Sequence, residues 1–227
     1  MKLTDITLKQ ILLDSQRLWN FGNGRNVYFT SDTHWSHTNI LHFCDRPFTS
    51  IEEMDEELIK RWNNVITNND IVFHLGDFCF AGPQRWNQIL KKLNGKKYLI
   101  IGNHDMQYIA KDTFMSETVN YFEGIYQQMN IFIDDWHIYL NHYPFLAYGG
   151  AYNAKRKVGQ LFGHVHYYNG SQGLDCSRLT DLFPYQYDVG VDNNDFTPVS
   201  WVKIKSIFES SGENGYKNMI EFKEENR

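Results

Sequence analysis

Hydrophobic positions along the chain fall into short runs typical of strands and longer periodic stretches typical of helices. Helical spacing of apolar residues predicts helices over 3–20, 50–66, 83–94 and 106–120. Apolar, β-branched and aromatic runs predict strands over 27–31, 70–75, 97–101, 125–134, 136–141, 158–162, 187–191 and 199–207. Helices alternate with strands in the first half, and strands dominate the second. The pattern therefore predicts an α/β fold with helices outside a central pair of sheets.

The chain is predicted to hold one main domain between two terminal segments. Residues 1–24 are expected to form a helical extension, which the breaker cluster Phe21-Gly22-Asn23-Gly24 ends. The main domain covers residues 25–210 and contains an irregular insertion at 168–187. Residues 211–227 form a charged tail. A length of 227 residues suits one domain of this kind.

Polar residues stand at the ends of five predicted strands. Each time, a hydrophobic run leads into an Asp, an Asn or a His. Because ligands of open α/β sheets bind beyond the carboxyl ends of the strands, these residues can converge on one site. In chain order the blocks are Asp32-Thr33-His34, Gly76-Asp77, Gly102-Asn103-His104-Asp105, Asn141-His142 and Gly163-His164-Val165-His166.

These blocks supply carboxylate, amide and imidazole ligands but no thiolate, a set that suits Mn, Fe, Zn or Co. Residues i and i+2 of an extended segment point the same way, so Asp32 and His34 can face one metal. His164 and His166 can serve two adjacent metals in the same manner. Asp77 is the natural candidate to bridge them. Two metals roughly 3.5–4 Å apart clamp both oxygens of a displacement at phosphorus and lower the pKa of a bound water to roughly 7.

Glycines precede three of the candidate ligands. Gly76, Gly102 and Gly163 stand directly before Asp77, Asn103 and His164. Since a residue without Cβ lets the backbone turn sharply, these positions are expected to leave room for metal and substrate.

Charge, cysteines and hydropathy restrict the partners. A formal net charge of -5 excludes broad binding of duplex DNA through phosphate neutralisation. Cys44, Cys79 and Cys176 are odd in number and widely spaced, which indicates reduced thiols and a cytoplasmic setting. The first residues carry acids, unlike a signal peptide, and no apolar run reaches transmembrane length. We therefore expect no membrane partner, and the oligomeric state stays open.

In this order, the five blocks resemble the motifs of the calcineurin-like metallophosphoesterase superfamily, across residues 27–166. Residues 27–34, with nearby His37 and Arg46-Pro47-Phe48, further resemble a small bacterial and phage branch of that superfamily. The resemblance implies a four-layer α/β/β/α sandwich with the site at one edge. It also implies two divalent metal ions, with Mn2+ favoured and Fe, Zn, Ni or Co as alternatives. The closing segments Val189-Gly190-Val191-Asp192 and Phe196-Thr197-Pro198-Val199 also fit that branch.

The resemblance also implies a role for each residue of the blocks. His104 would lie beside the scissile phosphate and either steady the transition-state charge or protonate the leaving group. Asp105 would hydrogen-bond to His104 and orient it. One metal would be held by Asp32, His34, Asp77 and His166, and the other by Asp77, Asn103, His142 and His164.

The expected reaction is metal-dependent hydrolysis of a phosphoester. His104 favours phosphodiesters, because a poor leaving group needs assistance, and nucleotides, cyclic nucleotides or nucleic-acid ends are the expected substrates. A phosphomonoesterase or nucleotide pyrophosphatase on the same site is an alternative. So is a binding or assembly module that keeps its metals. A Ser/Thr protein phosphatase is disfavoured, because Gly76-Asp77 is not followed by Asp-Arg-Gly and Asp105 replaces the usual Glu.

Several polar residues near the blocks allow two interpretations. His37 could line the substrate pocket or cap the following helix. Arg46 could bind a substrate phosphate, although a surface ion pair with the acids of residues 52–57 is the favoured interpretation. The basic run 155–157 is either a solvated loop or a contact to an anionic substrate. Residues interpreted as structural or as turn residues are His42, His74, His137, Asp192 and Asn194.

Overall fold

The computed structural model describes residues 19–21, 26–151, 156–166 and 182–211. Within these residues the strands form two mixed sheets. In spatial order, the first sheet contains β1 (Trp19–Asn20), β6 (Gln128–Ile133), β7 (Trp136–Asn141), β8 (Val158–Phe162) and β9 (Gln186–Asp188). The second contains β10 (Val199–Ser200), β2 (Val27–Thr30), β3 (Ile71–His74), β4 (Lys96–Ile100) and β5 (Phe122–Tyr126). The predicted α/β fold with paired sheets is confirmed.

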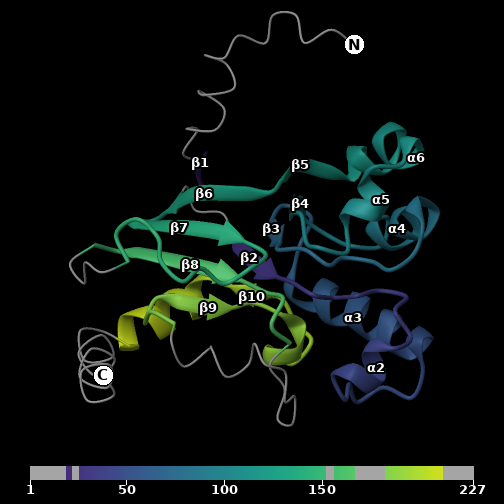
Figure 1. Ribbon diagram of the computed structural model, residues 1–227, viewed down its shortest axis with the longest axis horizontal. Helices are drawn as coiled ribbons and strands as arrows, with labels where there is room; N and C mark the ends of the chain where they lie inside the picture. The colour runs from purple at the N-terminus through teal and green to yellow at the C-terminus, as the bar shows by residue number, and fades with distance from the viewer. Residues whose placement is uncertain (1–18, 22–25, 152–155, 167–181, 212–227) are drawn as a thin grey trace, which may run out of the picture.

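The helices of residues 40–116 gather on one side of the sheets, whereas the helix of residues 201–211 lies apart from them (Figure 1). The longest is α3, and the others in the first half of the chain are one to two turns long. A short 3-10 turn, η3 (Val191–Asn193), follows β9. Between residues 40 and 121 the structure describes helices and one 3-10 turn: α2 (Ile40–Phe43), α3 (Ile51–Val65), α4 (Pro83–Leu90), α5 (Met106–Ile109), α6 (Asp112–Ser116) and η1 (Thr118–Tyr121).

A hydrophobic core fills the space between the two sheets. Strand β7 alternates strictly, and its inward residues Trp136, Ile138 and Leu140 are buried there. Phe29 and Phe73 reach the same core from the opposite sheet, with their rings stacked at 5.4 Å. Packing of residues from both sheets in this core joins the sheets into one unit and fixes the strand ends relative to each other.

A second core lies between the outer face of the β2–β3–β4 sheet and the helices. Helix α3 begins at Ser50, whose side chain accepts a hydrogen bond of 3.1 Å from the backbone N–H of Glu53. Its buried residues Met54, Leu58 and Trp62 recur every four positions, as an amphipathic helix requires. Since β3 is covered on both faces, all its residues are buried, and it reads as a continuous apolar run.

The predicted strand over 199–207 is wrong. Only Val199 and Ser200 form a strand, and residues 201–211 are helical. Trp201, Ile204 and Phe208 recur at a spacing of three and four and are buried between the sheets, whereas Val202 is 76% exposed. That period of 3.6 residues is the signature of a helix, and the β-branched residues of the segment obscured it.

Other predicted elements differ in extent. The predicted helix over 106–120 is divided into α5, α6 and η1. The predicted strand over 125–134 covers parts of β5 and β6, which belong to different sheets. Strand β6 pairs with β7 through the expected tight turn, where Asp134 has a φ of 53°.

The predicted terminal helix ends differently from expectation, since Trp19 and Asn20 form strand β1 and pair with β6. Most of this extension, most of the insertion at 168–187 and most of the tail lie outside the described residues. Cys44 and Cys79 are free and buried, and Cys176 also lies outside the described residues. None of the helices in the described ranges has the length and apolarity needed to cross a bilayer.

Candidate metal centre

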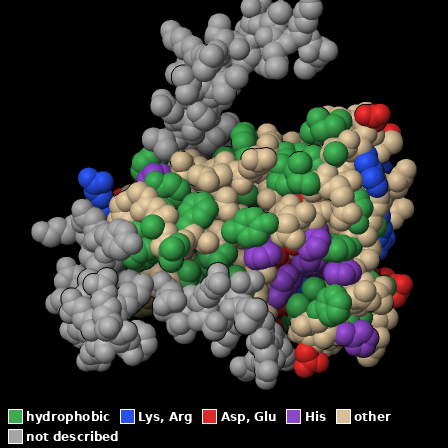
Figure 2. Space-filling view, in the orientation of Figure 1, with side chains coloured by type: hydrophobic (Ala, Val, Ile, Leu, Met, Phe, Trp, Pro, Cys, Tyr) green, Lys and Arg blue, Asp and Glu red, His purple; other side chains and the backbone are tan. Residues whose placement is uncertain are grey.

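The ends of strands from both sheets meet at one place. Strands β2, β3 and β4 run parallel in one sheet, and β7, β8 and β9 run parallel in the other. Backbone hydrogen bonds join the loops after β2 and β3: the N–H of Asp32 donates to Gly76 and that of His34 donates to Asp77. Figure 2 shows the resulting cluster of histidines on one face, flanked by hydrophobic side chains. The predicted convergence of the blocks is therefore observed.

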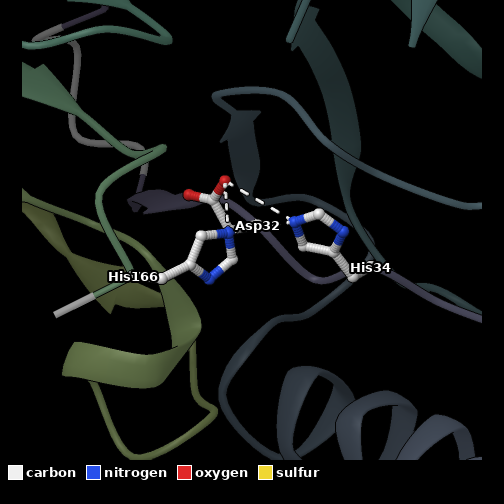
Figure 3. Close-up of side chains that lie close together, drawn as sticks. All are labelled: Asp32, His34 and His166. Carbon is white, nitrogen blue, oxygen red and sulfur yellow. Dashed lines mark hydrogen bonds and ion pairs between the residues drawn. The ribbon is translucent and has the colours of Figure 1, made fainter. Parts of the chain in front are cut away.

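Asp32, His34 and His166 form the first cluster of candidate ligands, with ligand atoms within 4.8 Å of one another (Figure 3). The Nε2 atoms of the two histidines lie 3.1 Å apart. Oδ1 of Asp32 lies 3.6 Å from Nε2 of His166 and 4.0 Å from Nε2 of His34. This oxygen is buried and has no hydrogen-bond partner among the described residues. Since buried polar atoms are nearly always paired, the orphaned oxygen fits a bound cation.

Asp77, His142 and His164 form the second cluster. Nδ1 of His142 donates a hydrogen bond of 2.8 Å to the carbonyl of Leu75, so its Nε2 carries the lone pair. That Nε2 atom lies 2.9 Å from Oδ1 of Asn103 and 3.6 Å from Oδ2 of Asp77. A nitrogen and two oxygens that all present lone pairs to one point fit a metal ion between them.

Asp77 lies between the two clusters. Its Oδ2 is 3.6 Å from Nε2 of His34 and also 3.6 Å from Nε2 of His142. Burial, together with the negative charge of Asp32, raises the pKa of Asp77 to about 6. Buried carboxylates that repel each other in this way are stabilised by divalent cations. Asp77 therefore lies where one oxygen can face both clusters, and its bridging role stays a prediction.

The backbone at the centre adopts rare conformations. Positive φ angles occur at five of the candidate ligands, all of them Asp or His, the residue types that tolerate this region better than most. Such strained residues cluster at functional sites because the surrounding structure has to hold them in place. The values are 56° at Asp32, 50° at His34, 55° at Asp77, 72° at His164 and 45° at His166.

The glycines make room for neighbouring loops and candidate ligands, while room for metal and substrate stays a prediction. Gly76 has a φ of 102°, and a Cβ there would come within 2.6 Å of the backbone of Gly102 and 2.7 Å of Nδ1 of His142. A Cβ on Gly102 would collide with the carboxylate of Asp77, and one on Gly163 with Asp32. Each glycine thus lets a loop pass directly behind a candidate ligand.

His104 borders the centre from the solvent side. Its side chain is 45% exposed, and its Nε2 lies 3.9 Å from Oδ2 of Asp77. Its backbone N–H donates a hydrogen bond of 2.9 Å to Oδ1 of the same carboxylate. Burial lowers the pKa of His104. The imidazole can therefore reach a group bound at Asp77 while remaining accessible to a substrate.

Asp105 acts differently from the expected orienting residue of His104. Its buried carboxylate accepts hydrogen bonds from the backbone N–H groups of Gly102, Asp77 and Phe78, at 2.8, 2.9 and 2.9 Å. Both of its oxygens are used in this way. Asp105 and His104 are both described, and no hydrogen bond joins their side chains. Asp105 thus joins the loops after β3 and β4 and positions Asp77 through the backbone.

Both interpretations of Arg46 are wrong. Its side chain is fully buried, and its guanidinium donates to the carbonyls of Asp32 and Thr33, at 2.7 and 2.9 Å. It also forms a two-pronged ion pair with Asp192, at 2.7 and 2.8 Å. Its ion-pair partner is thus Asp192 rather than an acid of residues 52–57, and within that segment Nη1 contacts Sδ of Met54 at 3.4 Å. Arg46 therefore supports the loop that carries Asp32.

Asp192 was expected to be a turn residue, but it contacts a candidate ligand. Its Oδ2 accepts a hydrogen bond of 2.8 Å from Nδ1 of His166, which directs Nε2 of that ring toward Asp32. Although burial raises the pKa of Asp192, Arg46 and His166 together hold it down at about 2. The carboxylate thus stays ionised and fixes the ring. Its sequence signals were its place shortly after strand β9 and in the segment Val189-Gly190-Val191-Asp192, which resembles the phage and bacterial branch.

Asp188 is a second carboxylate that the sequence reasoning missed. It accepts hydrogen bonds from the N–H of Gly190, at 2.8 Å, and from the side chain of Asn193, at 2.6 Å. Burial and the negative charge of Asp32 raise the pKa of Asp188 to about 7. It adds another acid behind the first cluster and increases the preference for cations there.

His37 and His74 behave differently. His37 does not cap helix α2, whose first turn has no side-chain cap, and its ring instead stacks on Phe80 beside the centre. His74 points away from the clusters, as predicted: its Nδ1 accepts from the N–H of Gly76 and its Nε2 donates to Thr33. Burial lowers the pKa of His74 to about 3, so the ring stays neutral.

The basic run at 155–157 lies away from the centre as far as it is described. Lys157 pairs with Asp135, and its carbonyl accepts from the N–H of His137 at the start of β7. The candidate ligands stand at the opposite ends of β7 and β8. Lys157 therefore belongs to the solvated loop of the first interpretation.

A sequence model of the calcineurin-like phosphoesterases matches residues 25–211. The chain belongs to this family. Family membership supports metal-dependent hydrolysis of phosphoesters. It also agrees with the clusters of candidate ligands described above.

The chain is also similar to individual family relatives. It is 26% identical over 200 residues to the Gene 66 protein of Mycobacterium phage D29, covering 78% of this chain and 94% of the relative. It is 46% identical over 83 residues to the uncharacterized protein MJ1445 of Methanocaldococcus jannaschii, covering 36% of this chain and 47% of the relative. The chain thus spans about half the length of the latter. The phage relative fits the predicted phage and bacterial branch.

A solved structure supports the fold. The crystal structure of AQ665 from Aquifex aeolicus, a protein of unknown function, aligns with a TM-score of 0.58 and 26% sequence identity. The alignment covers 81% of this chain and 99% of that chain. The paired-sheet architecture is therefore shared over nearly the whole of the smaller protein.

Proposed function

We propose that this chain is a binuclear-metal phosphodiesterase that acts on nucleotide-type esters or nucleic-acid ends. The observation that carries the proposal is the position of Asp77, whose Oδ2 lies 3.6 Å from a histidine nitrogen of each cluster. One carboxylate oxygen shared equally by two ligand sets suits a pair of adjacent metal ions.

The chain offers four ligands to each ion. Two divalent ions, Mn2+ being favoured, would supply Lewis-acid stabilisation of charge at phosphorus and an activated water. The orphaned oxygen of Asp32 and the lone pair on Nε2 of His142 support this assignment. One ion would be held by Asp32, His34, Asp77 and His166, and the other by Asp77, Asn103, His142 and His164.

His104 gives the site its preference for diesters. Its side chain is partly exposed beside Asp77, and its main chain is fixed by a hydrogen bond to the same carboxylate. A phosphoester held at Asp77 would place its leaving oxygen within reach of Nε2 of His104. Donation of a hydrogen bond or a proton from this ring would stabilise the negative charge that develops on a poor leaving group.

The experiment is a rate assay with bis-p-nitrophenyl phosphate in the presence of Mn2+. We expect hydrolysis that chelation abolishes and Mn2+ restores. Faster turnover of p-nitrophenyl phosphate than of the diester would favour a phosphomonoesterase, and release of pyrophosphate from nucleoside triphosphates would favour a nucleotide pyrophosphatase. Two bound metals without any turnover would indicate a binding or assembly module instead. The free, buried thiols of Cys44 and Cys79 support the proposed cytoplasmic setting.

A further inference from the structure

An aromatic wall extends from the candidate metal centre to the solvent. The ring of Phe80 lies 4.6 Å from that of His104 and 4.9 Å from that of His34. His37 stacks on Phe80 with a centroid distance of 3.8 Å and an angle of only 4° between the planes. Phe43 continues the surface, 6.3 Å from His37 and edge-on to it. We call His37, Phe43 and Phe80 the aromatic wall.

The wall is not explained by packing of the core. Phe43 is 70% exposed, at the end of a four-residue helix in which Ile40 is the only buried residue. His37 is half-buried, and its Nδ1 atom has no hydrogen-bond partner among the described residues. Stacking rather than hydrogen bonding therefore holds its ring. Large apolar side chains exposed next to a polar site commonly mark a place where a ligand binds.

We propose that the aromatic wall binds the planar ring of the substrate, a nucleobase or an aryl group, on the His104 side of the phosphorus. This inference rests on the proposed function, which places the phosphate at the two clusters. A nucleoside ester bound there would extend past His104 and meet Phe80 and His37. Aromatic side chains stack on any base because every base has a π-face.

Charge favours a small nucleotide ester over a long nucleic acid as the occupant. Arg46 lies close to the first cluster, but its side chain is fully buried. Each nitrogen of its guanidinium group already donates a hydrogen bond to a protein acceptor. It cannot contact a substrate phosphate. With a net charge of -5, the chain also lacks the excess of cations on which polyanion binding depends. Among the described residues beside the first cluster, the aromatic wall then offers stacking as the means of recognition.

The test compares AMP with ribose 5-phosphate as inhibitors of bis-p-nitrophenyl phosphate hydrolysis, because the two differ only by the adenine ring. We expect AMP to inhibit the wild-type protein at a concentration roughly 5- to 150-fold lower. Phe43→Ala should lower this ratio, because it removes the exposed end of the wall while His37 and Phe80 remain. Met115→Ala is the matched control, since Met115 is 58% exposed on the short helix α6 and lies outside the wall. It should leave the ratio unchanged.

Equal inhibition of the wild-type protein by the two ligands would overturn the inference, and so would a ratio that survives Phe43→Ala. A dimer that Phe43→Ala dissociates, seen by sedimentation velocity, would also overturn it, because a second copy would then cover the wall. If no ester is hydrolysed, the same two ligands are titrated calorimetrically into Mn2+-loaded protein. Preferential binding of AMP in that case would support the wall while the proposed hydrolysis fails, so the two failures are distinguishable.

Discussion

The carboxylate of Asp192 accepts a hydrogen bond of 2.8 Å from Nδ1 of His166. The same carboxylate forms a buried, two-pronged ion pair with Arg46, which in turn holds the carbonyl of Asp32 at 2.7 Å. The first cluster is thus fixed from both sides, at the ring of His166 and at the backbone of Asp32. A carboxylate behind a metal-binding histidine sets its tautomer and increases its basicity.

Asp192→Asn is expected to weaken metal binding without removing any ligand. The substitution takes away the negative charge behind His166 and leaves Arg46 buried without its partner. We expect the Mn2+ affinity, measured by calorimetric titration, to fall about 10- to 100-fold and the free energy of unfolding to fall by about 3–5 kcal/mol.

The matched control for that substitution is Asp195→Asn. Asp195 also pairs with an arginine, Arg61, but its side chain is 90% exposed, so both quantities should stay near their wild-type values. A folded Asp192→Asn protein with unchanged Mn2+ affinity would show that the hydrogen bond to His166 has no part in metal binding.

Asp77→Asn is expected to remove both metal ions together. Oδ2 of Asp77 lies equally close to the two clusters, so loss of its charge weakens both. Asn103→Ala should remove only the ion of the second cluster. The side-chain oxygen of Asn103 lies within hydrogen-bond distance of His142, a ligand of that cluster. The measurement is metal content per chain by elemental analysis after gel filtration. Retention of one ion by Asp77→Asn would contradict the bridging role.

The convergence of the candidate ligands was predictable because their order and their place after strands are local properties. Asp32, Asp77 and His142 each follow a strand whose apolar run is visible in the sequence. The side chains that support them were not predictable in the same way. Arg46 and Asp192 are separated by 146 positions, and only the packing of η3 against the loop after β2 makes them partners. A buried arginine and a surface arginine have the same local sequence signal.

The errors in the fold have a similar origin. Residues 201–211 contain β-branched and aromatic residues that fit a strand by composition, but their burial follows a helical period. The division of residues 122–133 between two sheets depends on which partner strands are available, β4 or β7. Neither choice is encoded within the segment itself.

His104→Ala should lower diester turnover far more than metal content. The side chain reaches the substrate side of Asp77 but belongs to neither cluster, so the ions should remain. General acid catalysis of this kind contributes roughly 10²–10⁴-fold, and kcat for bis-p-nitrophenyl phosphate should fall by that factor. Gln107→Ala is the control, because Gln107 is exposed and only donates to the carbonyl of His104. Equal loss of metal and turnover in His104→Ala would contradict the assigned role.

His74 makes the stability of the metal-free protein dependent on pH. Burial lowers its pKa to about 3 in the folded state, against about 6.5 in the unfolded state. Between these values the unfolded state binds more protons, so this contribution is complete above pH ~6.5 and is lost progressively as the pH falls toward 3. From pH 7.5 to pH 5 the loss is roughly 2 kcal/mol.

His74→Gln cannot titrate and should lack this dependence. We expect the variant to be less stable than the wild type at pH 7.5, since it disturbs the hydrogen bonds to Thr33 and Gly76. At pH 5 the difference between the two proteins should be smaller by about 2 kcal/mol. Urea unfolding with EDTA at both pH values measures this. Because the remaining titrating groups are common to both proteins, their effects cancel, and parallel pH profiles would show that His74 takes up a proton without unfolding.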